Sequence, residues 1–448
     1  MDIHTLNLTL ILTLCLALYL PRFLPSSQHP SQPPKSTTTA TPPAAPKPKG
    51  STIPFLTAYT LAMSSDWLQG PFLYPLYSAE HHLPPTLIPA LFTAGFLSSA
   101  LSSGPIGRWA DVYGRKKACL AFCGISALSC ALTIGMGGGV FGLGGLVMGR
   151  VFGGVGTGLL FVGFESWVVG DLRKEGREGE MGRVFGVMSG LNGVAAIVCG
   201  VGSEAVVGWA GTRKAPFVVA IGTLGVAAGV IWRFWEENYG EIATPSDKDG
   251  KQGSSTSVWT VLTNPQVLAL GLASTVFEGS MYLFVFFWAP ALKSVQSNPG
   301  ELPYGVIFAS FMAATLASSL IFNIITERQL LRHATLLVAI LAVSAACFFA
   351  SAKPRSEQSA FWVFCLFEAA VGMYWPCMGF LKGRLVEDSV RAQVYGLLRI
   401  PLNVFVVVSL LFTGDGDAFG KVFPVCSTLL LASAGTVWAV MSGQAIAS

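Results

Sequence analysis

The 448-residue sequence predicts an all-α membrane protein built of two six-helix halves, with one additional helix at the N-terminus. Three observations lead to this fold class. Hydrophobic residues make up 52% of the chain and charged residues only 12%, whereas soluble proteins carry about 25% charged residues. Apolar stretches long enough to cross a bilayer recur along the chain. A polar stretch near the middle separates six of them from six more.

Two segments precede the predicted bundle. Residues 1–20 are apolar and lack a basic leading region, so we expect an uncleaved anchor helix and regard a signal peptide as the alternative. Residues 21–50 contain nine prolines and eight Ser or Thr residues. This composition cannot form a hydrophobic core and predicts a disordered linker.

The twelve predicted spans share an apolar composition and a length sufficient to cross the bilayer. The first six lie at residues 53–77, 87–103, 118–135, 143–169, 184–207 and 215–234, and the second six at residues 267–292, 304–325, 334–350, 361–381, 394–413 and 422–441. They divide the chain into an N-terminal half at 51–235, a central loop at 236–257 and a C-terminal half at 258–448. Transporters with this layout hold their substrate where the two halves meet.

The positive charges are distributed unevenly between the loops. Of the 28 Lys and Arg residues, twenty fall in the linker and in the alternate loops that include residues 104–117, six fall in the other loops, and two lie within spans. Short loops rich in Lys and Arg stay in the cytoplasm. We therefore expect residues 104–117 and the C-terminus to be cytoplasmic and the N-terminus to lie outside.

The loop between the second and third spans carries a recognisable spacing. It includes Gly107, Asp111, Gly114, Arg115 and two following lysines, and this many charges cannot enter lipid. The G-x3-D-x2-G-R-K spacing resembles the signature between helices 2 and 3 of major facilitator superfamily transporters. The resemblance implies that these four residues latch the halves in the outward-facing state, and Glu165 at the same depth is the expected partner.

Five ionisable residues fall well inside the spans. They are Asp66, Arg150, Glu278, Glu368 and Arg399. At roughly 2.5–3.5 kcal/mol each, five unmatched charges would cost about 12–17 kcal/mol on insertion. They must therefore face a water-filled cavity, pair with one another or become neutral. Four of them lie on the first, fourth, seventh and tenth spans, the helices that line the central cavity in the superfamily that the chain resembles.

Several stretches are also similar to the eukaryotic molybdate-anion transporter family. The strings that carry this resemblance include Asp66-Trp67-Leu68-Gln69-Gly70-Pro71, Gly163-Phe164-Glu165-Ser166-Trp167, Phe277-Glu278-Gly279, Gly372-Met373-Tyr374-Trp375-Pro376 and Arg399-Ile400-Pro401-Leu402. The additional N-terminal helix agrees with this family as well. The resemblance implies a multi-pass protein of the plasma membrane that takes molybdate into the cell.

Part of this expectation follows from the residues themselves. Molybdate is a dianion, and Arg150 and Arg399 are the two cations at mid-membrane depth. The planar guanidinium group offers paired donors that suit an oxyanion and stays charged. Asn403 and Tyr374 complete the candidate substrate-binding residues. Helix register alone does not show that the two arginine side chains converge on one site.

The energetics of uptake point to coupling with a cation. Moving a dianion into a cell that is 100 mV negative costs about 4.6 kcal/mol, which opposes accumulation by roughly a thousandfold or more. Uptake therefore needs a co-transported cation or a strong cytoplasmic sink. Glu278, Glu368 and Asp66 are the candidate proton carriers, with the first two ranked above Asp66.

Other functions are weighed against this one. A superfamily carrier of another solute, such as sulfate, an organic anion or a drug, is the main alternative. A receptor or scaffold would not need the charged loop or the charges within the spans, and an enzyme would need a catalytic cluster that the sequence does not present. No cofactor, metal site or nucleic-acid partner is expected, and the adjacent His81 and His82 are expected to be solvated. The sequence indicates no protein partner.

Overall fold

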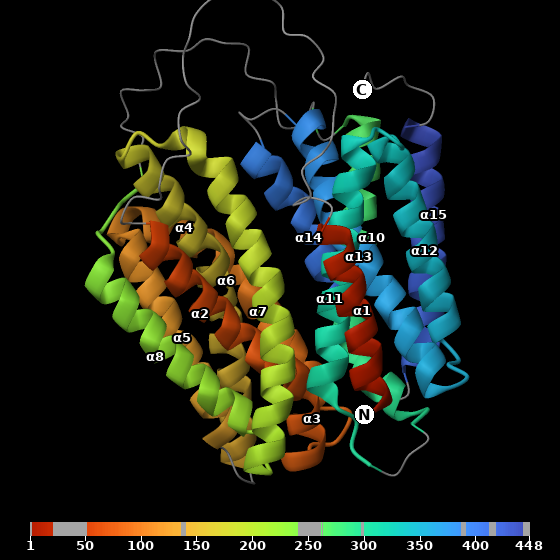
Figure 1. Cartoon of the computed structure of the whole chain (residues 1–448), viewed down its shortest axis with the longest axis horizontal. Coiled ribbons are helices and arrows are strands. Elements are labelled where there is room, and N and C mark those ends of the chain that lie inside the picture. Colours follow the sequence, from red (N-terminus) through yellow and green to blue (C-terminus); the bar gives the residue numbers. More distant parts are fainter. Residues whose placement is uncertain are drawn as a thin grey trace, which may run out of the picture.

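The computed structural model describes residues 2–20, 52–135, 140–240, 261, 263–296, 300–386, 391–411 and 418–441. All regular secondary structure within these ranges is helical. Figure 1 shows two groups of helices, with α2 to α8 on the left and α10 to α15 on the right. The predicted all-α fold of two six-helix halves with an additional N-terminal helix is confirmed. The predicted linker and most of the predicted central loop lie outside the described residues.

The N-terminal half contains six long helices. They are α2 (Thr52–Gln69), α4 (Ile88–Tyr113), α5 (Arg115–Gly135), α6 (Val140–Lys174), α7 (Met181–Ala210) and α8 (Ala215–Phe234). The short η4 helix (Glu178–Glu180) precedes α7. The C-terminal half contains the other six, which are α10 (Pro265–Lys293), α11 (Tyr304–Glu327), α12 (His333–Ser351), α13 (Glu357–Leu385), α14 (Arg391–Leu411) and α15 (Phe419–Met441).

The first span of the bundle is not one regular helix. After α2 the chain continues through a 3-10 turn (η2, Gly70–Phe72), a single α-helical turn (α3, Leu73–Pro75) and a π-helical turn (η3, Leu76–Glu80). Proline has no backbone N–H and its ring displaces the preceding turn. Pro71 and Pro75 therefore interrupt the hydrogen-bond ladder of the single span predicted at residues 53–77.

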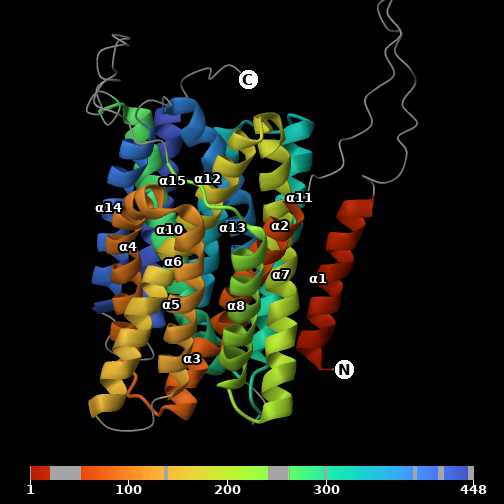
Figure 2. The ribbon, with the colours of Figure 1, turned by 90° about the vertical axis from the view of Figure 1, so that its left-hand side faces the viewer.

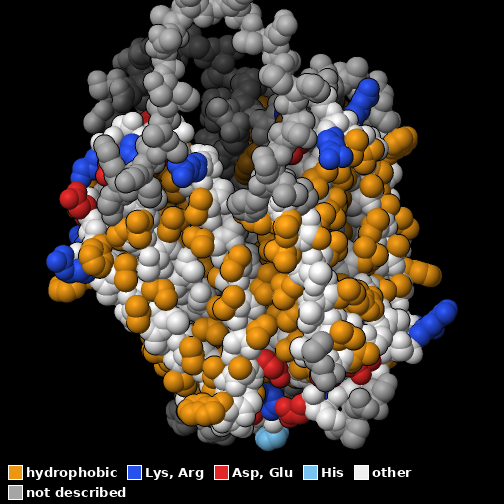
Figure 3. All heavy atoms as spheres, viewed as in Figure 1, with side chains coloured by type: hydrophobic (Ala, Val, Ile, Leu, Met, Phe, Trp, Pro, Cys, Tyr) orange, Lys and Arg blue, Asp and Glu red, His pale blue; other side chains and the backbone are white. Residues whose placement is uncertain are grey.

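Nine of the described helices are long and apolar enough to cross a membrane, by length and composition. Shorter apolar stretches lie in α4 (Ile88–Ser102) and α14 (Leu397–Leu410). Hydrophobic side chains cover the middle of the face seen in Figure 3, and charged side chains gather toward its two ends. This distribution is typical of a protein whose surface meets lipid.

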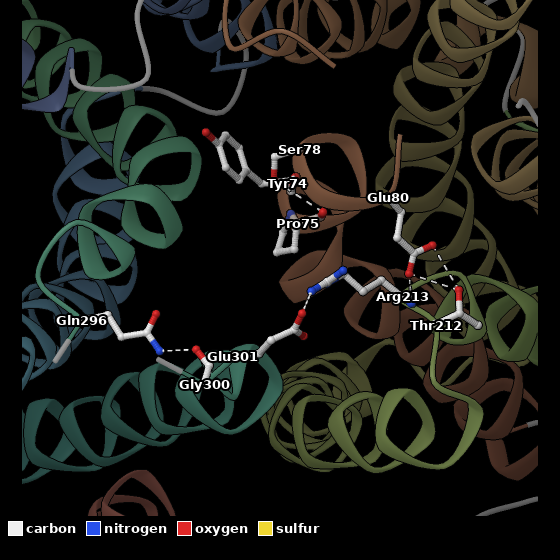
Figure 4. A network of polar contacts seen from close by, with 9 residues as sticks. All are labelled: Tyr74, Pro75, Ser78, Glu80, Thr212, Arg213, Gln296, Gly300 and Glu301. Atoms are coloured by element: carbon white, nitrogen blue, oxygen red, sulfur yellow. Dashed lines mark hydrogen bonds and ion pairs between the residues drawn. The ribbon is translucent and has the colours of Figure 1, made fainter. Parts of the chain in front are cut away.

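The two halves are held together at one end of the bundle, which we call the Arg213 end. Arg213, between α7 and α8, forms an ion pair with Glu301, which precedes α11 (Figure 4). The carboxylate of Glu204 on α7 accepts a hydrogen bond of 2.7 Å from the backbone N–H of Gly305 on α11. The opposite end carries the charged loop between α4 and α5, and we call it the Asp111 end.

Close packing supports these polar contacts. A Cβ atom added to Gly305 would lie 2.3 Å from the carbonyl oxygen of Gly200, so α7 and α11 approach each other through two glycines. Aromatic side chains meet across the boundary in the pairs Phe72–Tyr304, Tyr74–Phe286, Phe92–Phe286, Phe96–Tyr282 and Trp67–Phe308, with ring centroids 5.0 to 6.3 Å apart. These contacts join the halves from the Arg213 end toward the middle of the bundle.

The N-terminal helix α1 (Ile3–Tyr19) packs on the C-terminal half, chiefly on α11. Figure 2 shows it on the outside of the bundle. His4 Nε2 lies 2.7 Å from a carboxylate oxygen of Glu357 at the start of α13, and Asn7 donates a hydrogen bond of 3.0 Å to Gln358. The predicted anchor helix is thus a packed part of the fold.

Candidate functional site

Arg150 on α6 is a cation inside the bundle without a bonded anion among the described residues. Its guanidinium lies over Gly95 of α4, where a Cβ atom would come within 2.7 Å of Nη2. The guanidinium carbon is 5.4 Å from the centre of the Phe92 ring. The Nε atom is buried and has no hydrogen-bond partner. Because an unmatched buried donor costs roughly 1–3 kcal/mol, this arrangement favours a ligand that accepts hydrogen bonds and carries negative charge.

Asp66 on α2 is the nearest candidate acid to this arginine. Its carboxylate lies within electrostatic range of Arg150 and of the buried Cys130 on α5. Nevertheless, Asp66 is exposed to solvent. Asp66 is thus an exposed carboxylate that shares the N-terminal half with Arg150.

Arg399 lies on α14, a helix of the C-terminal half that packs against α4 of the N-terminal half, and it is exposed. It lies within electrostatic range of Tyr282 on α10, and that tyrosine packs against Phe96 of α4 at 5.0 Å. Phe96 follows Phe92, which Arg150 contacts, by one helical turn. Arg150 thus contacts one ring of this aromatic group, and Arg399 lies within electrostatic range of another. Asn403, one turn beyond Arg399, is half-buried.

Glu278 on α10 is buried and accepts hydrogen bonds from two neighbouring side chains. The Ser274 hydroxyl, one turn earlier on α10, lies 2.6 Å from Oε1. The Tyr374 hydroxyl of α13 lies 2.8 Å from the same oxygen. The Tyr374 ring is fully buried and stacks on Phe277 at 3.9 Å. Tyr374, a candidate substrate-binding residue, thus holds a carboxylate in this conformation.

Sequence reasoning missed Lys382. The sequence places it in the loop after the tenth span, which is predicted to end at residue 381, but α13 continues to Leu385. Its Nζ donates a hydrogen bond of 2.8 Å to Ser274 Oγ and lies 3.8 Å from Glu278 Oε1. A spacing signal was present, because Tyr374 and Lys382 are eight residues apart and so share one face of a helix.

Glu368 occupies a different place from Glu278. It is buried on α13 and accepts a hydrogen bond of 3.1 Å from the Thr315 hydroxyl of α11. This contact lies inside the C-terminal half. The ionisable residues predicted within the spans therefore do not form one cluster: Asp66 and Arg150 are neighbours, Arg399 lies near the Glu278 group, and Glu368 is separate.

The charged loop is clasped by the segment that follows α8. Arg115 pairs with Asp111 at 2.7 Å, and its backbone N–H donates to the carbonyl of Asn238 at 3.0 Å. The carboxylate of Glu237 accepts from the backbone N–H of Lys116 at 2.8 Å. These contacts tie the loop between α4 and α5 to the start of the central loop, and they do not involve the C-terminal half.

Gly114 and Glu165 complete the predicted gating set, together with Gly107. Gly114 ends α4 with φ of +119°, a conformation that residues with a Cβ rarely adopt. A Cβ atom there would also lie 2.5 Å from the Glu237 carboxyl carbon. Gly107 faces Val162 of α6 at ordinary contact distance. Glu165 is exposed and is not paired with Arg115 in this conformation.

His81 is tied to the protein and is not freely solvated as expected. Its Nε2 lies 2.9 Å from the carbonyl oxygen of Thr133 at the end of α5, so that nitrogen donates a proton. Burial lowers the pKa of His81 below its usual value.

Comparisons with known proteins agree with one another on the class of protein that this chain resembles. Residues 35–356 match the sequence model of a family described as sugar transporters, 12 TM. The chain is 32% identical over 391 residues to the molybdate-anion transporter of Xenopus tropicalis, and the alignment covers 84% of this chain and 83% of that protein. It is 30% identical over 423 residues to the molybdate-anion transporter of Danio rerio, covering 85% and 84% of the two chains.

Solved structures share the fold at low sequence identity. The POT family transporter PepTSo superposes with a TM-score of 0.72 at 10% identity, covering 89% of this chain and 99% of that one. A D-xylose-proton symporter gives a TM-score of 0.67 at 12% identity, covering 86% and 96%. These likenesses concern the fold alone, and it is the transporter fold that the loop between α4 and α5 predicts.

Proposed function

The chain belongs to the molybdate-anion transporter family of the major facilitator superfamily, and from that premise we propose that it takes molybdate into the cell across the plasma membrane by alternating access. It is a transporter, as its relatives are. The substrate, the mechanism and the coupling ion are the proposal.

One observation carries the choice of an oxyanion. Arg150 keeps a buried Nε without a hydrogen-bond partner, and its guanidinium occupies the space that Gly95 leaves free of a side chain. Arg399 brings a second positive charge to the boundary of the halves. A tetrahedral dianion needs two such charges and several donors. A neutral sugar, the substrate class in the description of the matching family, would leave both charges without compensation, which is costly away from bulk water.

Alternating access agrees with the packing of the halves. Contacts at the Arg213 end join α7 to α11, while Asp66 of one half and Arg399 of the other are exposed. The distribution of Lys and Arg favours a cytoplasmic Asp111 end and C-terminus. The conformation is therefore inward-facing in this proposal, with its closed end outside.

Proton coupling would let a dianion accumulate against an inside-negative potential. Asp66 faces solvent beside Arg150, so it can exchange a proton while it influences the anion site. Glu278 is bonded to Ser274 and Tyr374, and Glu368 to Thr315. A proton on any of the three would reduce repulsion toward the incoming dianion.

Uptake of labelled molybdate by cells that express this chain tests the proposal directly. We expect uptake above that of cells without the chain, saturation with concentration, and weaker inhibition by sulfate than by unlabelled molybdate. Uptake of sulfate in preference to molybdate would instead assign the chain to the alternative of a carrier for another anion. No uptake of either anion by protein that reaches the cell surface would contradict the proposal.

A further inference from the structure

Lys382 is a largely buried cation that no step described above employs. Only 17% of its side chain is exposed, and its partner Glu278 is 7% exposed. Lysines near the ends of membrane helices usually extend outward, so that the ammonium group reaches water. The Lys382 side chain instead turns inward from the last turn of α13 to α10, where it meets Ser274 and Glu278. By contrast, Arg384 on the same turn is exposed.

The contacts of Lys382 would allow its ammonium group to exchange one hydrogen-bond acceptor for another. Its ammonium group donates to Ser274 Oγ at 2.8 Å, and the Ser274 hydroxyl donates in turn to Glu278 Oε1 at 2.6 Å. The direct distance between Lys382 and Glu278, 3.8 Å, is longer than that of a hydrogen bond. The ion pair is therefore held partly through a hydroxyl group. An ammonium group has three donors, so Lys382 can turn to another acceptor while Ser274 keeps its bond to Glu278.

The position of Lys382 connects it to the anion site. Lys382 lies within electrostatic range of Arg399 on α14, and α14 also supplies the Tyr395 ring, whose centre is 5.8 Å from Nζ. Lys382 sits eight residues nearer than Tyr374 to the end of α13 at the Asp111 end of the bundle. An anion that leaves Arg399 toward this end would pass its ammonium group.

We infer that Lys382 is a third anion-binding residue, which takes the transported oxyanion from Arg399 toward the Asp111 end and is held by Glu278 when no anion is present. This inference rests on the proposed function and adds to it a site on the exit path. The anion and the Glu278 carboxylate compete for one ammonium group.

This competition couples binding of the anion at Lys382 to protonation of Glu278. If the anion takes Lys382 while Glu278 stays charged, a buried carboxylate loses its counter-charge, which is strongly unfavourable. If Glu278 accepts a proton from water, the carboxyl is neutral and Lys382 is free to bind the anion. The titratable or charged groups around Glu278 are Tyr282 on α10, Tyr374 and Lys382 on α13, and Arg399 on α14. The helix α15 approaches α10 near Ser280 through Cys426.

The test measures molybdate binding by calorimetry to the purified full-length protein in lipid nanodiscs, at several pH values. Lys382→Ala should weaken binding by about tenfold or more, as expected for the loss of a charge-assisted hydrogen bond, and Lys382→Arg should restore part of it. Glu278→Gln should strengthen binding severalfold and reduce its dependence on pH. In the double variant Glu278→Gln with Lys382→Ala, that gain should be absent. Arg384→Ala is the matched control on the same helix turn and should bind as the unaltered protein does.

The outcomes separate the inference from the function on which it rests. Wild-type affinity in Lys382→Ala, or an equal gain from Glu278→Gln with and without Lys382, would overturn the role of Lys382 and leave the proposed function standing. If the unaltered protein binds no molybdate, both are overturned. The Glu278→Gln comparison keeps the test decisive if Lys382→Ala alone folds poorly, because the neutral pair in the double variant leaves no unpaired buried charge.

Discussion

The carboxylate of Glu204 in one half accepts a hydrogen bond of 2.7 Å from the backbone N–H of Gly305 in the other. Gly305 is in the first turn of α11, where backbone N–H groups lack partners within the helix and favour a negative charge. Because Gly200 and Gly305 also bring the backbones into contact, this relationship fixes the closed Arg213 end.

The first prediction concerns this closed end. Gly305→Ala would place a Cβ atom 2.3 Å from the Gly200 carbonyl oxygen, so α7 and α11 must separate. We expect a larger outward-facing population. The measurement is labelling by a membrane-impermeant thiol reagent of Phe308→Cys, introduced into a chain whose native cysteines are replaced. Gly208→Ala on α7 is the control, because a Cβ atom there meets nothing within 4 Å. Equal labelling rates in the two variants would contradict the role of the Gly200–Gly305 contact in closing the Arg213 end.

The second prediction concerns the two arginines. Arg150→Ala and Arg399→Ala should each abolish molybdate transport while the protein still reaches the cell surface. Lys at either position should rescue transport only in part, because an ammonium group lacks the paired donors of the guanidinium. Arg328→Ala, at an exposed position after α11, is the control. Full transport by Arg399→Ala would remove that residue from the site.

The third prediction concerns the clasp at the Asp111 end. Asp111→Ala or Arg115→Ala removes the 2.7 Å pair that orders the loop between α4 and α5. If this loop latches the halves in the outward-facing state, both changes should shift the resting population toward the inward-facing one. Accessibility labelling from the outer side reports the shift. Unchanged labelling in both variants would contradict a latch role for this loop. It would also contradict the expected pairing of the loop with Glu165.

The fourth prediction concerns proton coupling. If Glu278 or Glu368 exchanges protons during the cycle, uptake should increase as the outside pH falls and should collapse when a protonophore dissipates the gradient. Glu278→Gln or Glu368→Gln should leave exchange of anion for anion but prevent accumulation. Proteoliposomes loaded with unlabelled molybdate separate the two activities. Uptake indifferent to pH and to the protonophore would leave trapping inside the cell as the driving force.

Much of the fold follows from sequence patterns that act locally. The backbone N–H and C=O groups of each span must form hydrogen bonds within their own helix, because lipid offers no hydrogen-bond partners. Length and hydropathy therefore identified the two sets of six helices and the additional helix at the N-terminus. The break after Gln69 was also local in origin, since Pro71 and Pro75 stand in the sequence.

The sequence by itself determined which charges the membrane must accommodate, because the cost of a charge in lipid depends on its position along the span. It therefore selected Asp66, Arg150, Glu278, Glu368 and Arg399. Only the tertiary structure decided the partners of these charges. Lys382 reaches Glu278, and Glu368 meets Thr315 instead, because the crossing of α10, α11 and α13 determines which side chains come within hydrogen-bond distance. Such distances of about 3 Å depend on contacts between residues far apart in the chain, and no local pattern encodes them.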